Sequence, residues 1–216
     1  FMDDPAGTGA TKKISLSDDV VIRSFNETTQ EYDVFEGDYN KKSGKNIYPM
    51  WYSNIVVGEE LYFLCSGSGY AHKNAGANYS IGRVNLRSER VEYLELPVRL
   101  TYSNQEQILI WGKGVKTETS NSRGLDVASD GRSKRDGWAW NFNPNPVACK
   151  DIIYFTLMGG ISYSIKAGTK NFDSSALVAV NDLGPAGKTW SLTTPSLVGK
   201  RIYQRTLKEI ICIEKD

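Results

Sequence analysis

The sequence has few of the side chains that metal and nucleophilic sites most often require. It contains a single histidine, His72, so any mechanism that needs a pair of histidines is excluded. It has no Cys-x-x-Cys pair, which argues against a structural zinc site. No run of about 18 apolar residues occurs, so no transmembrane helix is expected. Charge of one sign is also lacking, because 26 basic and 25 acidic residues leave a net charge of +1. A dedicated nucleic-acid surface would show a basic excess, so no nucleic-acid partner is expected.

Cysteine is scarce as well. The three cysteines, Cys65, Cys149 and Cys212, cannot all pair with one another. Each lies in or beside an apolar segment that reads as a strand, and cysteine packs there as a small hydrophobic residue. We therefore expect three buried free thiols, with a single disulfide bridge as the alternative.

The residues that are abundant indicate β-structure. The chain of 216 residues has 12 tyrosines, 5 tryptophans and 20 glycines, a composition typical of strands joined by many turns. Signals for helices are nearly absent. A chain of this length can bury a core without disulfides, so we expect one large all-β domain.

Three segments of the chain share one pattern. Residues 53–62, 145–154 and 195–203 each run from small apolar residues through a polar turn to an aliphatic residue and a tyrosine. This pattern predicts a tight hairpin between two strands. The tyrosines are Tyr62, Tyr154 and Tyr203, which lie 92 and 49 residues apart, so the period is near 46 residues. A period of this size is typical of a β-propeller blade of four short antiparallel strands.

The repeat predicts about four and a half blades in a single propeller domain. Residues 1–12 are expected to be disordered or to lead into the first strand. The blades are placed at about residues 13–48, 49–97, 98–143 and 144–192, and residues 193–216 supply half of another.

The segment from Ala176 to Trp190 carries a resemblance to a known family. It contains Gly187, Lys188 and Trp190 in the order found in the tryptophan-docking repeat of the PQQ-like, or quinoprotein-type, β-propellers. The resemblance covers about residues 50–216 and is strongest after Asn145, as in the C-terminal portion of such proteins. It implies that Trp190 docks between blades. It also implies a bacterial protein of the periplasm or the extracellular space.

Propellers of this family have six to eight blades, more than this chain offers. Either the chain is the C-terminal part of a longer propeller, or it closes alone as a small ring. A partial propeller would expose unpaired blade faces, which soluble proteins avoid. We therefore expect a companion chain or fragment, or a homo-oligomer, that covers these faces.

The resemblance does not extend to the cofactor. Quinoprotein dehydrogenases hold PQQ with adjacent cysteines or their substitutes, a calcium or lanthanide ion and a catalytic aspartate, and this chain has no adjacent cysteines. Asp126, Asp130 and Asp136 do not match the spacing of a calcium loop, so no metal site is predicted. No catalytic residue and no cofactor is predicted. The alternative is part of a PQQ-dependent oxidoreductase whose cofactor ligands, with calcium, lie outside this chain.

One polar and aromatic segment is a candidate for ligand binding. Trp138 and Trp140 are two residues apart, so in a strand they would face the same side. Together with Arg135 and Asp136 they could form an aromatic platform for a sugar, or they could be packing residues of the repeat. We expect a non-catalytic binding or scaffold propeller that recognises protein or glycan through its blade loops.

Overall fold

The computed structural model describes residues 12–39, 47–66, 79–111, 123, 144–157, 159–184 and 191–214, with the side chains of 48–53 left out. These residues form strands β1 to β15 and one short 3₁₀ helix. The prediction of an all-β chain is therefore confirmed. None of the helical residues in these ranges forms a segment long and apolar enough to cross a membrane.

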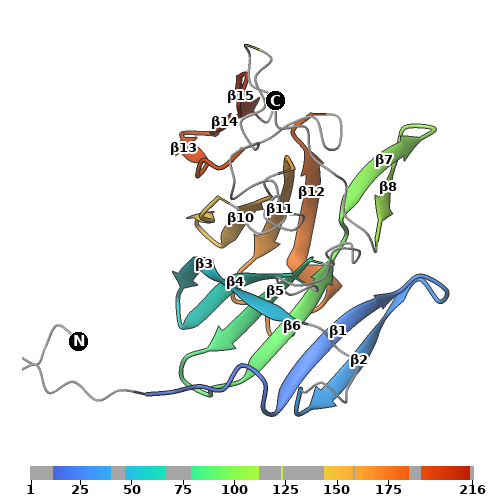
Figure 1. Ribbon diagram of the computed structural model, residues 1–216, viewed down its shortest axis with the longest axis vertical. Helices are drawn as coiled ribbons and strands as arrows, with labels where there is room; N and C mark the ends of the chain where they lie inside the picture. The colour runs from blue at the N-terminus through green and yellow to red at the C-terminus, as the bar shows by residue number, and fades with distance from the viewer. Residues whose placement is uncertain are drawn as a thin grey trace, which may run out of the picture.

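The largest sheet has six strands in the order β2-β1-β6-β5-β4-β3. Four of its strands, consecutive in the sequence, form an antiparallel meander that ends at the sheet edge with β3 (Figure 1): β3 (Tyr48–Val57), β4 (Glu60–Ser66), β5 (Tyr79–Asn85) and β6 (Val91–Leu96). This meander coincides with the segment of about residues 49–97 that is predicted as the second blade. Every residue of β6 is buried, so both faces of the sheet are covered there.

The first two strands belong to this same sheet. β1 (Val20–Asn26) and β2 (Glu31–Gly37) form a hairpin, and β1 pairs with β6 in parallel. The prediction of a separate blade over residues 13–48 differs from this arrangement. The physical reason is that β6 is buried on both faces, so the strand that pairs with its edge away from β5 must begin with apolar residues. Val20, Val21 and Ile22 of β1 supply them, with exposed fractions of 7% or less.

A second meander forms a four-stranded sheet in the order β12-β11-β10-β9. A register shift between Ser164 and Ile165 marks a bulge in the pairing of β11 with β12. The 3₁₀ helix η2 (Ser174–Ala176) comes just before β12, and Asp173 caps it by accepting a hydrogen bond from the Ser175 N–H. The strands are β9 (Val147–Cys149), β10 (Ile152–Thr156), β11 (Ile161–Lys166) and β12 (Leu177–Asp182).

Two smaller units complete the described chain. The hairpin of β7 (Arg99–Ser103) and β8 (Glu106–Ile110) projects from the body of the molecule (Figure 1), and the side-chain amide of Gln107 donates to the Val180 carbonyl of β12 at 2.9 Å. At the C-terminal end lies a three-stranded sheet of β13 (Ser196–Val198), β14 (Arg201–Arg205) and β15 (Ile210–Glu214).

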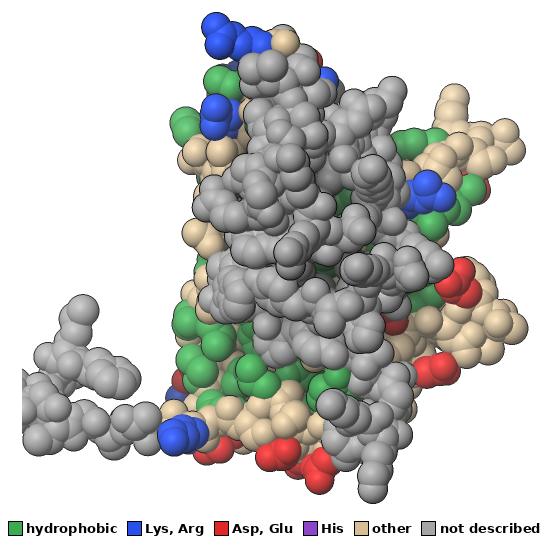
Figure 2. Space-filling model, in the orientation of Figure 1, with side chains coloured by type: hydrophobic (Ala, Val, Ile, Leu, Met, Phe, Trp, Pro, Cys, Tyr) green, Lys and Arg blue, Asp and Glu red, His purple; other side chains and the backbone are tan. Residues whose placement is uncertain are grey.

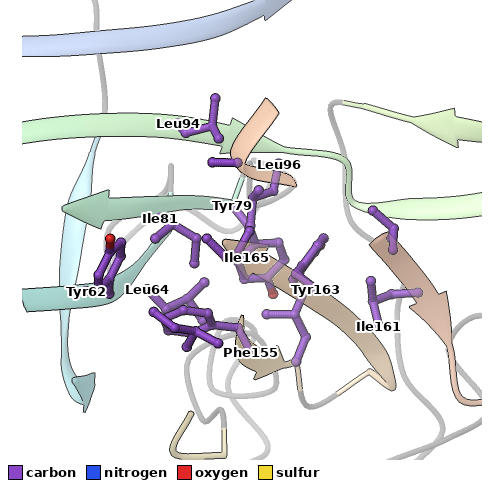
Figure 3. Close-up of a cluster of buried hydrophobic side chains, with 14 of the residues drawn as sticks. Tyr62, Leu64, Tyr79, Ile81, Leu94, Leu96, Phe155, Ile161, Tyr163 and Ile165 are labelled. Carbon is purple, nitrogen blue, oxygen red and sulfur yellow. The ribbon is translucent and has the colours of Figure 1, made fainter. Parts of the chain in front are cut away.

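The main core lies between the two meanders. Alternate residues of β4, β5 and β6 point toward β10 and β11, as the period of two in a strand requires. Figure 3 shows these side chains meeting between the sheets. The fully buried members, each less than 2% exposed, include Tyr62, Leu64, Ile81, Leu94, Phe155, Tyr163 and Ile165.

The opposite face of the six-stranded sheet has its own core. Phe63, Cys65 and Tyr93 lie there with β1 residues, packed against Phe35 of β2. Gly82 of β5 is directly opposite Phe63 in the ladder, and an added Cβ at Gly82 would lie 2.4 Å from the Phe63 ring. Glycine at this position therefore makes room for the aromatic ring.

The cysteines follow this layout. All three are free, and Cys65 is buried, as predicted. Cys149 and Cys212 are exposed, which corrects the prediction that all three are buried. Cys149 ends the short strand β9, and Cys212 lies on the outward face of the three-stranded sheet, where no described element covers it.

Candidate functional site

The residues predicted to bind a ligand lie outside the described residues. This holds for Arg135, Asp136, Trp138 and Trp140, so the aromatic platform stays a prediction. It also holds for the docking-motif residues, which are Gly187, Lys188 and Trp190.

The three repeat tyrosines occupy equivalent positions. Tyr62, Tyr154 and Tyr203 are each the third residue of the strand that follows a two-residue hairpin, with loops at residues 58–59, 150–151 and 199–200. The first loop residue has a positive φ in every case, namely 62° at Gly58, 56° at Lys150 and 60° at Gly199. A positive φ at this position is a feature of the tight turns that match the twist of a hairpin. The same local geometry therefore recurs three times along the chain.

Tyr62 is the most buried of the three tyrosines and is held by two polar contacts. Its hydroxyl donates to the Glu60 carboxylate and accepts a hydrogen bond from the Gly168 N–H at 2.9 Å. Burial, with the nearby Glu60 carboxylate as a further cause, raises the pKa of Tyr62 to about 12. The phenol therefore stays protonated at neutral pH, and its contacts join β4 to the turn after β11.

A group of buried and partly buried charges lies beside Tyr62. We call it the ion cluster, and it consists of Arg23, Glu60, Arg83 and Glu92. Arg83 and Glu92 are each only 4% exposed in their side chains and form a direct ion pair. Arg23 approaches the other carboxylate oxygen of Glu92 at 3.2 Å, and Arg83 approaches Glu60 at 3.3 Å. Each buried charge therefore has an opposite charge beside it, as burial requires.

The ion cluster connects the two meanders. The Arg83 guanidinium donates to the Thr169 carbonyl and lies 4.9 Å from the centre of the Phe172 ring. Both residues belong to the segment between β11 and β12, whereas Arg83 is on β5. Because the donors of Arg83 are used within the protein, the arrangement is suited to fixing the two sheets rather than to binding a substrate anion.

The hairpin of β1 and β2 carries a strong negative charge. Residues 18–38 contain seven carboxylates and one arginine, a local charge of −6 in a chain of net charge +1. Figure 2 shows Asp and Glu side chains along the bottom and lower right of the molecule, where β1 and β2 lie in Figure 1. β2 is the last strand at this end of the sheet order.

An open cavity of about 490 Å³ lies at the start of this hairpin. Asp19 has a φ of 50° there, and its N–H donates to the Asp38 carboxylate at 3.0 Å. Glu89 forms an ion pair with Lys12 at 2.7 Å. Nowhere in the described chain do three His, Cys, Asp or Glu side chains come together as a metal site. The cavity is lined by Ile14, Ser15, Asp18, Asp19, Val21, Glu36, Ser88, Glu89 and Arg90.

No protein-family model and no curated protein matches this sequence. The likeness of Ala176–Trp190 to a tryptophan-docking repeat therefore rests on the residues of the motif alone.

An aromatic cluster that the sequence did not reveal joins distant parts of the chain. Trp111 stacks on Phe25 with ring centres 3.9 Å apart and an angle of 10° between the planes. Tyr32 meets both rings edge-on, and its hydroxyl donates to the Glu95 carbonyl at 2.9 Å. The three residues come from β1, β2 and the end of the β7–β8 hairpin. Only the tertiary structure brings them together, because no local pattern relates residue 111 to residues 25 and 32.

Proposed function

We propose that this chain is a non-catalytic binding or scaffold module in which each four-stranded meander acts as one blade of a propeller-type array. The observation that supports this most directly is the pairing of the meander β3–β6 with the meander β9–β12 across one apolar core. Both meanders begin with the same two-residue hairpin, followed by the same aliphatic-tyrosine pair. A unit that cannot bury its own faces gains stability by stacking on such neighbours.

The C-terminal sheet supports the same proposal. β13–β15 begins with the third copy of the hairpin and contains three strands in the described chain. The ion cluster between the first two meanders would hold them at a fixed relative position. Rigid scaffolds of this kind carry recognition on the loops between their strands.

The ligand class that we propose is a protein or a glycan, bound by an extracytoplasmic bacterial protein. Trp138 and Trp140 would offer ring faces to a sugar, and Arg135 and Asp136 would supply hydrogen bonds. Binding to a glycan array, followed by calorimetry on the best hit, tests this directly. We expect Trp138→Ala with Trp140→Ala to abolish binding. Tyr102→Ala is the control, because Tyr102 is an aromatic residue that is 65% exposed on β7, outside the platform. Binding that survives the double substitution would reject the platform.

A crystal structure of the complete natural protein tests the arrangement of the blades. The proposal requires the sheets of β3–β6, β9–β12 and β13–β15 to lie radially around one axis. Sheets packed as a flat sandwich, with no common axis, would refute it.

The docking motif of Ala176–Trp190 favours one second candidate, a part of a PQQ-dependent oxidoreductase. The described residues do not fit the cofactor, since they bring no three metal-ligating side chains together and the sequence has no adjacent cysteines. The ligands would have to come from elsewhere in the complete protein. Adding PQQ and calcium and following dye reduction with alcohols or sugars is the test, and the absence of turnover would remove this candidate.

A further inference from the structure

The cavity at the start of the β1–β2 hairpin has the size of a small-molecule site. Its volume of about 490 Å³ lies within the range of about 300–1,000 Å³ that ligand pockets occupy. Three parts of the chain meet there, namely the segment that leads into β1, the end of β2 and the turn between β5 and β6. Every residue that lines the cavity belongs to the described part of the chain.

Two aliphatic side chains supply the apolar part of the lining. Val21 of β1 is only 7% exposed, and Ile14 packs against the core that contains Phe63 and Tyr93. Both side chains are held by contacts on other sides, so they form a fixed apolar surface. A hydrocarbon chain laid on that surface would lose contact with water, which is favourable.

Three carboxylates line the same cavity without a local counter-charge. Asp18, Asp19 and Glu36 form no ion pair with any residue in the described ranges. They belong to the hairpin whose local charge is −6. A concave surface lined by charges of one sign raises the local concentration of ions of the opposite sign. The cavity is therefore suited to a cation.

The two other charged residues of the lining already have partners. Glu89 pairs with the Lys12 ammonium group at 2.7 Å, and Arg90 approaches the buried Glu92 at 3.5 Å. Lys12 does not itself line the cavity. Its contact with Glu89 shows that the rim of the cavity accepts a primary ammonium group.

The spacing of the carboxylates favours an organic cation over a metal ion. In the described chain no three His, Cys, Asp or Glu side chains come close enough together to hold a metal. A metal ion needs its ligands to converge on one point. Carboxylates that are spread around an apolar surface instead match a ligand whose positive charges are joined by a hydrocarbon chain.

We propose that this cavity binds an organic cation that carries primary ammonium groups on a hydrocarbon chain. The ammonium groups pair with Asp18, Asp19 and Glu36, and the chain lies on Ile14 and Val21. Two sources have this chemistry, a free polyamine and a lysine side chain of a partner protein. The site is separate from the aromatic platform and does not depend on the arrangement of the blades.

Titration calorimetry on the full chain tests the proposal with two probes, spermidine and a short peptide that has one central lysine. The buffer contains about 0.15 M salt, which screens charges farther than about 8 Å from the ligand. We expect saturable binding of one probe molecule per chain. Binding of spermidine alone identifies a free polyamine, and binding of the peptide identifies a lysine side chain. If neither probe binds saturably, the proposal is overturned.

A matched pair of double variants separates the cavity from the general negative charge of the hairpin. Asp18→Asn with Glu36→Gln removes two charges from the lining. Glu27→Gln with Glu31→Gln removes two charges from the same hairpin at exposed positions outside the lining. We expect the cavity variant to raise the dissociation constant about fivefold or more, because it loses two ion pairs with the ligand. The control should change it by less than about twofold. Equal weakening in both variants would show that diffuse charge attracts the probe, and would overturn the proposal.

Discussion

Replacing Arg83 by methionine is the sharpest test of how the two meanders are held together. Methionine keeps most of the length and the packing of the side chain against Phe172, but it removes the charge and the donors. Glu92 would remain 4% exposed, with Arg23 at 3.2 Å and the exposed Arg90 at 3.5 Å as its remaining partners. The Thr169 carbonyl would lose its hydrogen bond from Arg83.

The expected cost follows from the burial of the pair. Removing one partner of a buried ion pair destabilises a protein by about 3–5 kcal/mol, because an uncompensated charge is left behind. Arg23 still compensates part of the Glu92 charge, which places the expected loss near the lower end, about 3 kcal/mol. For a chain of this size such a loss corresponds to a fall in Tm of roughly 6–12 °C.

Urea unfolding followed by tryptophan fluorescence measures this loss. Arg87→Met is the matched control, because Arg87 is paired with Glu59 but is 79% exposed. An exposed pair contributes about 0–1 kcal/mol, so the control should unfold almost as the wild type does. Adding Glu92→Gln to Arg83→Met should recover part of the stability. If Arg83→Met costs no more than the control, the ion cluster does not hold the sheets together.

Three further predictions concern single positions. Gly82→Ala should destabilise the chain by about 1–3 kcal/mol in urea unfolding through its overlap with the Phe63 ring, and Phe63→Leu in the same chain should relieve that loss; an unchanged midpoint would contradict the packing argument. In the folded protein a thiol reagent should modify Cys149 and Cys212 rapidly, whereas Cys65 should react only after unfolding, because it is buried and burial raises the pKa of its thiol; rapid labelling of all three would disprove this. The Ser175 hydroxyl, with its N–H, lowers the pKa of Asp173, so this carboxylate stabilises the fold above its unfolded-state pKa and loses that contribution as the pH falls through the lowered value. Asp173→Asn should therefore lose less stability than the wild type between about pH 5 and pH 2, and parallel pH profiles would refute this.

The tight hairpins were predictable because their signal is local. A polar pair between apolar residues, followed by an aliphatic residue and tyrosine, needs only neighbouring residues to form its turn. Tyr62, Tyr154 and Tyr203 accordingly stand at equivalent places in the structure. The all-β class followed from the same kind of signal.

The long-range pairings were not predictable from the sequence. The parallel pairing of β1 with β6 joins residues about 70 positions apart. The apolar run Val20-Val21-Ile22 predicts a buried strand but does not indicate which other strand it will pair with. The exposure of Cys149 and Cys212 was missed for a related reason, since an apolar neighbourhood in the sequence does not show whether another element covers that face. In the sequence, Arg83 and Glu92 have the pattern of surface charges that alternate with apolar residues along a strand. They are buried because the segment around Thr169 and Phe172 packs against them in the folded chain.

The sequence by itself determined the strands, the turns and the three recurring hairpins, because these depend on residues that are close together along the chain. The tertiary structure alone decided which strand edges meet and which charges are buried, because these depend on contacts between segments that the chain brings together only on folding.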